Sequence, residues 1–124
     1  MTNIDEDCIS YFIVVDGIKA EAGSLFREQF PNSRGGVRPD TLMPYRSIPC
    51  ELSEIENALM WITKNLTNSY STTCISIGVQ SIRSWANFNV PRQLIELAQK
   101  YQIDLKISFL SSAGKKRNDS PNEA

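Results

Sequence analysis

The sequence predicts an α/β domain of the α+β kind, in which a single layer of mixed β-sheet carries about three helices packed mainly on one face. Three observations support this prediction. Two segments alternate apolar and polar residues, other segments repeat apolar residues at helical spacing, and 124 residues suit one domain. The expected order of elements is β-α-(β)-α-β-α-β, in which the bracketed strand is left open.

The first strand is expected at residues 9–15 (ISYFIVV), which are rich in β-branched and aromatic side chains and stop at the turn signal Asp16-Gly17. Their nearly continuous apolarity predicts a strand buried on both faces. A helix follows over residues 18–30, where apolar residues recur at helical spacing, and Pro31 ends it.

Residues 31–49 contain four prolines and the pair Gly35-Gly36, which predict irregular chain. A segment of this length without regular structure is uncommon inside a compact domain, and it is often functional. The sequence leaves open whether residues 45–48 form a short edge strand.

A helix is expected to begin at Ser53. Ser53 at the N-cap and Glu56 three residues later have the spacing of a capping box, in which each side chain accepts a hydrogen bond from the other residue's backbone N–H. The apolar stripe of this helix consists of Ile55, Leu59, Ile62 and Leu66, widened by Ala58.

Residues 73–81 and 103–109 alternate in hydrophobicity and predict two further strands, with a short helix after Pro91 between them. Residues 73–110 have the length of a βαβ unit, which favours parallel pairing through a right-handed crossover. The globular domain is expected over residues 8–110, between an acidic segment (1–7) and a flexible polar tail (111–124).

Charge and hydropathy argue against nucleic-acid and membrane partners. The formal net charge is −1, so the chain lacks the concentrated positive field that nucleic-acid binding requires. No run approaches the roughly 18 apolar residues of a membrane helix.

Cys8, Cys50 and Cys74 are odd in number and widely spaced, unlike a disulfide framework. The acidic start MTNIDEDC differs from a signal peptide, so a cytosolic location is expected. Cys8 and Cys74 fall in predicted strands, where we expect them to be buried as small hydrophobic residues.

Catalytic residues are not evident. The chain has no histidine, which removes the commonest general base and metal ligand, and no phosphate-loop, dinucleotide or zinc motif occurs. Glu54 and Glu56 are two residues apart on the expected helix and point in different directions, so helix capping explains them better than paired-acid catalysis. We therefore expect a protein that is not an enzyme and uses no metal or cofactor.

Two groups of residues are candidates for binding another protein. The first is an acidic patch made of Asp5, Glu6, Asp7, Glu51 and Glu54, which would attract a basic partner. The alternative is two separate acidic segments, each solvated.

The second group is Trp85 and Phe88 in the loop RSWANFN. These aromatic residues either anchor a partner or fold down over the core.

An alternative function is the binding of a small molecule or anion by the loop that contains Arg34, Arg38 and Arg46. Guanidinium groups and the backbone N–H groups of Gly35-Gly36 suit an anion. A glycine-bearing surface turn with solvated arginines explains the same residues.

The segment ISIGVQSIRSWANFNVPRQLIELAQKYQIDLKISFL resembles the closing strand-loop-helix-strand block of a bacterial family of small domains. YFIVVDG, PNSRGG and ELSEIENALMWITKNL precede it in a compatible order. Small domains of this kind resemble immunity proteins of contact-dependent inhibition and other polymorphic toxin systems. The resemblance implies a protein that binds and neutralises a cognate toxin domain, often a nuclease, and it assigns no functional residue.

Overall fold

A central strand, β1 (Cys8–Asp16), pairs along both of its edges. It runs antiparallel to β3 (Pro44–Cys50) on one side and to β4 (Thr72–Ser81) on the other. β2 (Arg34–Val37) and β5 (Asp104–Ser111) complete an open mixed sheet in the order β2-β3-β1-β4-β5. The computed structural model describes residues 8–81 and 88–111.

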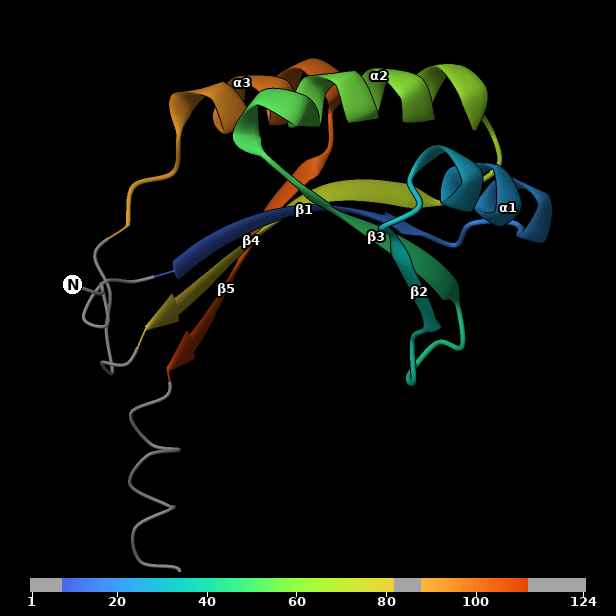
Figure 1. Ribbon diagram of the computed structural model, residues 1–124, viewed down its shortest axis with the longest axis horizontal. Helices are drawn as coiled ribbons and strands as arrows, with labels where there is room; N and C mark the ends of the chain where they lie inside the picture. Colours follow the sequence, from blue (N-terminus) through green and yellow to red (C-terminus); the bar gives the residue numbers. More distant parts are fainter. Residues whose placement is uncertain (1–7, 82–87, 112–124) are drawn as a thin grey trace, which may run out of the picture.

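Three helices cover one face of this sheet: α1 (Ala20–Gln29), α2 (Ile55–Asn65) and α3 (Arg92–Tyr101). In Figure 1 they lie together above the strands, and the opposite face carries no helix in the described part of the chain. The predicted fold class, a single mixed sheet with helices mainly on one face, is confirmed. No helix among the described residues is long and apolar enough to cross a membrane.

The hydrophobic core lies between the sheet and the helices. β1 and β4 contribute alternate side chains that are fully buried, and each helix contributes its inner stripe. The largest fully buried side chains are Phe26, Ile13, Ile55, Leu59, Ile62, Leu66, Ile75, Ile77, Leu94 and Val15.

Burial of β1 on both faces is contradicted. Phe12 and Val14, which alternate with the buried Ile13 and Val15, are only half-buried. The reason is that β1 has antiparallel neighbours, so no helical crossover is placed over its second face.

The irregular segment expected at residues 31–49 is instead the β2–β3 hairpin. β3 is an interior strand, and β2 forms the edge. The pair Gly35-Gly36, which predicts a turn, lies in β2 instead. Both positions favour glycine, because a Cβ at Gly35 would lie 2.6 Å from Nη1 of Arg46, and one at Gly36 would lie 2.8 Å from the hydroxyl oxygen of Tyr45. The absence of side chains at these two positions leaves room for the large cross-strand side chains of Arg46 and Tyr45.

The start of α2 differs from the prediction. A 3₁₀ turn (Leu52–Glu54) precedes the helix, and the backbone N–H of Glu51 donates to Oε1 of Glu54 at 3.1 Å. Ser53 is therefore not the N-cap, and Glu56 accepts a hydrogen bond from Lys100 at 2.8 Å instead of closing a capping box. The helix therefore starts later than a cap at Ser53 requires, because residues 52–54 form a 3₁₀ turn before the first α-helical residue, Ile55.

The apolar stripe of α2 is confirmed: Ile55, Ala58, Leu59, Ile62 and Leu66 are all buried. The parallel pairing expected over residues 73–110 is also confirmed, because β4 and β5 pair in parallel on either side of α3.

We predict that two isoleucines facing each other across β4 and β5 differ strongly in their contribution to stability. Ile77 is 0% exposed and its cross-strand neighbour Ile107 is 53% exposed. Ile77→Ala should lower the free energy of unfolding by about 2–5 kcal/mol, and Ile107→Ala by roughly 0.5 kcal/mol or less. Urea denaturation measures both, and equal losses would contradict the difference in burial between the two side chains.

Candidate functional site

The described helices do not extend over the full length of β4 and β5, and exposed apolar side chains lie at this end of the sheet beside the buried Val79. In Figure 1 the C-terminal ends of β4 and β5 run away from the helices, beside the start of β1. On the helix-side face at this end, Ile9, Ile107 and Phe109 are 40%, 53% and 45% exposed. The buried Val79 pairs with Ile9 on one side and with Phe109 on the other, so all of these side chains are on the same face of the sheet. The three exposed residues Ile9, Ile107 and Phe109 are here called the apolar end patch.

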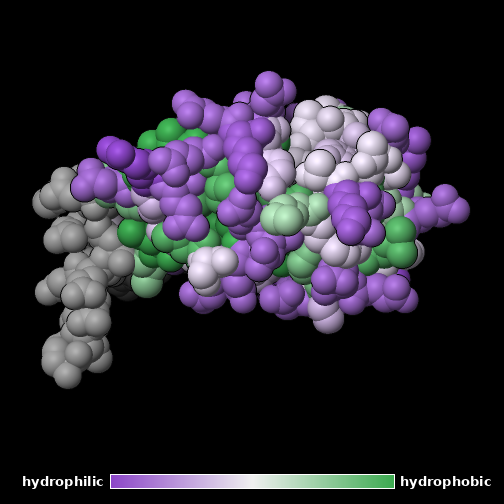
Figure 2. Space-filling model, turned by 90° about the horizontal axis from the view of Figure 1, so that it is seen from above, coloured by the Kyte–Doolittle hydropathy of each residue, from purple (hydrophilic) through white to green (hydrophobic). Residues whose placement is uncertain are grey.

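Hydrophobic residues also interrupt the hydrophilic surface in the view from the helix side. Figure 2 shows green patches among the purple residues toward the end of the molecule beside the grey atoms. Large exposed apolar side chains in contact with one another are characteristic of binding surfaces, whereas isolated ones are ordinary. The apolar end patch is therefore a candidate site.

A notch of about 540 Å³ borders this patch. It forms because β1 continues past its last pair with β3, Tyr11 with Cys50, so residues 8–10 have a strand on one side only. Ile9 belongs both to the notch and to the apolar end patch. The notch is lined by Ile9, Ser10, Tyr11, Phe12, Asn32, Pro49, Cys50, Glu51 and Glu54.

The notch has a negative rim. Glu51 and Glu54 are both exposed, and none of the described residues that line the notch is basic. The hydrogen bond from the Glu51 backbone N–H holds the Glu54 carboxylate at the N-terminal end of the 3₁₀ turn. An apolar surface with an acidic rim favours a basic partner that carries apolar groups.

Two of the three thiols, those of Cys50 and Cys74, are poor nucleophiles. Burial, together with the charge of Glu54, raises the pKa of Cys50 to about 11. Cys74 on β4 is 6% exposed, as predicted, and burial raises the pKa of its thiol as well. Thiols with raised pKa values stay protonated near neutral pH, where the thiolate is the reactive form.

The prediction that Cys8 is buried is wrong, because Cys8 is exposed. It lies at the start of the described part of β1, where the strand pairs with β4 but no longer with β3.

The structure brings only part of the predicted binding set together. Glu51 and Glu54 lie in the notch. Cys8 begins β1 at this same end of the sheet, whereas Asp5, Glu6, Asp7 and Trp85 lie outside the described residues. Phe88 is half-buried and packs against the core, as the lid interpretation of its loop expects.

The three arginines of the alternative anion site are not brought together. Arg34 and Arg46 occupy positions of opposite side-chain direction in the β2–β3 ladder, since Arg34 pairs with Ser47 and Arg46 with Gly35. Arg46 also pairs with Val15, a core residue on the helix side.

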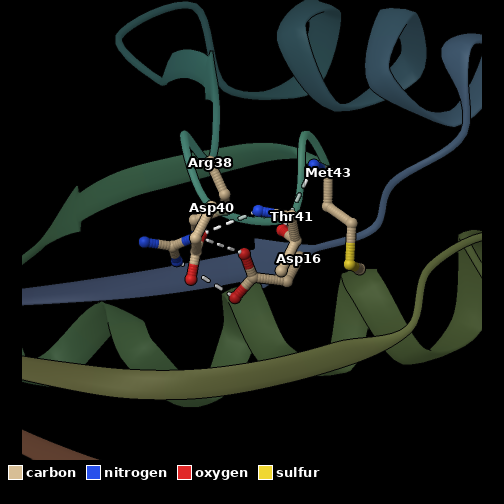
Figure 3. Close-up of polar contacts among 5 residues, drawn as sticks. All are labelled: Asp16, Arg38, Asp40, Thr41 and Met43. Carbon is tan, nitrogen blue, oxygen red and sulfur yellow. Dashed lines mark hydrogen bonds and ion pairs between the residues drawn. The ribbon is translucent and has the colours of Figure 1, made fainter.

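Arg38 is engaged in an ion pair at the end of β1. Its Nε and Nη2 donate to the two carboxylate oxygens of Asp16 at 2.8 and 3.1 Å (Figure 3), and its guanidinium lies 4.5 Å from the ring centre of Tyr45. The hydrogen bond to Asp16 is the main cause that raises the pKa of Arg38.

The loop beyond Arg38 is closed by local hydrogen bonds. The Thr41 N–H donates to Asp40, and the Met43 N–H donates to Oγ1 of Thr41. Arg38 thus ties the β2–β3 loop to β1, and this role explains it without a ligand.

Within residues 8–81 and 88–111, no group of three or more cysteine, aspartate or glutamate residues could hold a metal ion. Comparisons with protein-family models, with curated proteins and with solved structures found no match to this chain.

We predict that Cys8 accounts for the fast reaction of this protein with a thiol reagent. At pH 8 a thiol of pKa about 11 is roughly 0.1% thiolate, so Cys50 should react slowly. Its reaction should accelerate as the pH rises toward 11, because the thiolate fraction grows. Stopped-flow labelling of the wild type and of Cys8→Ser measures this, and a fast phase that survives Cys8→Ser would contradict it.

We also predict that the Asp16–Arg38 pair makes a small contribution to stability. The Arg38 side chain is 40% exposed, so solvent weakens the interaction to about 0.5–1 kcal/mol. A double-mutant cycle with Asp16→Asn and Arg38→Gln, followed by thermal unfolding, measures the coupling. The matched variant Arg34→Gln should show no coupling to Asp16→Asn.

Proposed function

We propose that this chain is a non-catalytic protein-binding domain, an immunity protein that binds and neutralises a cognate toxin domain through the apolar end patch and the notch. The observation that carries the proposal is that Ile9, Ile107 and Phe109 are exposed at one end of the sheet, where Ile9 also lines the notch that contains Glu51 and Glu54.

The surface has the composition of a protein interface. Interfaces combine a desolvated apolar centre with a polar rim, and a few large side chains supply most of the binding energy. Ile107 and Phe109 lie on β5, an edge strand of the described sheet, and provide such a centre. The outer edge of β5 also offers backbone hydrogen-bonding groups to an extended segment of the partner.

The charge of the notch indicates the chemistry of the partner. Two exposed carboxylates without a basic neighbour in the lining attract a positively charged surface. Enzymes that cleave nucleic acids present basic surfaces to the phosphate backbone. An acidic, partly apolar inhibitor that covers such a surface would exclude the substrate, which agrees with the resemblance to immunity proteins.

A binding role also fits the chemistry of the chain. The sequence has no histidine, and the pKa values of Cys50 and Cys74 are raised. These features give little support to general-base or thiolate catalysis.

The test has two stages. A tagged chain is used to capture partners from the native bacterium, and any captured domain that arrests growth when expressed alone is purified for titration calorimetry. We expect the wild-type chain to restore growth and to bind the toxin domain at equal stoichiometry. Phe109→Ser and Glu51→Gln should each weaken binding by about tenfold or more.

Two matched variants serve as controls. Leu25→Ser removes an apolar side chain of similar exposure (48%) on α1, and Glu28→Gln removes an exposed carboxylate of the same helix. Both should bind like the wild type. A toxin that remains lethal in the presence of the chain, or binding that Phe109→Ser and Leu25→Ser weaken equally, would refute the proposal.

A further inference from the structure

A second pocket lies between α1 and the β2–β3 hairpin, at the opposite end of β3 from the notch. Its volume is about 400 Å³, within the range of small-molecule sites. The pocket is lined by Ile18, Lys19, Ala20, Gly23, Ser24, Arg27, Gly35, Gly36, Val37, Pro44, Tyr45 and Arg46.

One face of α1 forms a wall of this pocket. Ala20, Gly23, Ser24 and Arg27 recur at helical spacing and all line it. Gly23 weakens a helix interior by comparison with alanine, yet here its missing side chain leaves open space, because a Cβ at this position would meet no atom within 4 Å. The absence of a side chain at Gly23 therefore enlarges the pocket on the α1 side.

The charged residues of the lining are all basic. Lys19, Arg27 and Arg46 contribute three positive charges, and none of the described lining residues is acidic. The pocket also lies at the beginning of α1, where the helix dipole favours negative charge. Three cations without a carboxylate favour a ligand with more than one negative charge.

Arg46 carries the observation that points most directly to a ligand. Its Nη2 donates to Oγ of Ser33 at 2.8 Å and to the Ser33 carbonyl at 3.3 Å, so the guanidinium lies beside Ser33, the residue before β2. Its Nε is shielded from solvent and has no acceptor among the described residues. A buried donor without an acceptor costs stability, and an anion that draws the guanidinium toward the pocket would supply the acceptor.

We propose that this pocket binds a small molecule bearing a phosphate group, with Lys19, Arg27 and Arg46 as its ligands. A phosphate group carries up to two negative charges and several acceptor oxygens, which match a guanidinium fork and two further cations. The volume exceeds that of the phosphate group alone and leaves room for the rest of a small ligand. Arg34 and Arg38 take no part in this site, because Arg38 is paired with Asp16 and neither lines the pocket.

The direct test observes the arginine Nε–H groups by ¹H–¹⁵N NMR while inorganic phosphate is added at constant ionic strength. The Nε–H resonance of Arg46 should shift saturably. The Nε–H of Arg38, which already donates to Asp16, is the internal control and should not move. An Arg46 resonance that does not shift, or arginine resonances that all shift together without saturation, would overturn the proposal.

Charge-neutralising variants give an independent readout. Lys19 and Arg27 are exposed, so Lys19→Gln and Arg27→Gln should fold normally and weaken phosphate binding by about tenfold each. Arg34→Gln removes the same kind of charge outside the pocket and should leave the affinity unchanged. Equal weakening by Arg27→Gln and Arg34→Gln would show diffuse attraction and overturn the site.

This inference does not rest on the toxin-binding proposal, since the two surfaces share no residue. Phosphate binding without toxin binding, or the reverse, would identify which of the two fails.

Discussion

The placement of all described helices on one face of the sheet is the constraint on which the rest of the structure depends. It divides each central strand into a buried side, such as Ile13 and Val15 of β1, and a side that stays partly in water. It also limits how far the core reaches, because the helices do not cover the whole length of β4 and β5. The apolar end patch agrees with this limit, since Ile107 and Phe109 face the helix side and are still 53% and 45% exposed.

The two candidate surfaces lie at opposite ends of β3 and have opposite charge. The notch carries exposed carboxylates beside apolar side chains, whereas the pocket next to α1 is lined by Lys19, Arg27 and Arg46. Within the described residues, a chain of net charge −1 thus carries two surfaces of opposite charge. Such a distribution orients a charged partner as it approaches, and salt reduces this effect.

Local patterns in the sequence predicted the elements that depend on local physics. The stripe from Ile55 to Leu66 predicted the buried face of α2, and the alternation in residues 73–81 predicted β4. Features that depend on contacts between distant residues were not predictable in this way. Gly35 and Gly36 suggest a turn when only their neighbours in the sequence are considered. Their actual role is to make room for the side chains of Arg46 and Tyr45 from the neighbouring strand.

The candidate sites show the same limit. Glu51 and Glu54 could be singled out as exposed acids, but the residues of β1 that line the notch with them, such as Ile9, are brought alongside only by the fold. Arg34 and Arg46 are separated because alternate residues of paired strands face opposite sides, and Arg38 is paired with Asp16. Arg46 is joined instead by Lys19 and Arg27 of a preceding segment.

The central position of β1 has a consequence for how the chain is made. β1 precedes every other described strand, but its two neighbours in the sheet begin only at Pro44 and Thr72. During synthesis its apolar segment therefore leaves the ribosome long before either partner exists. Contacts so distant in sequence slow folding and prolong the exposure of apolar surface. The second edge of β1 therefore stays unpaired until β4 has emerged.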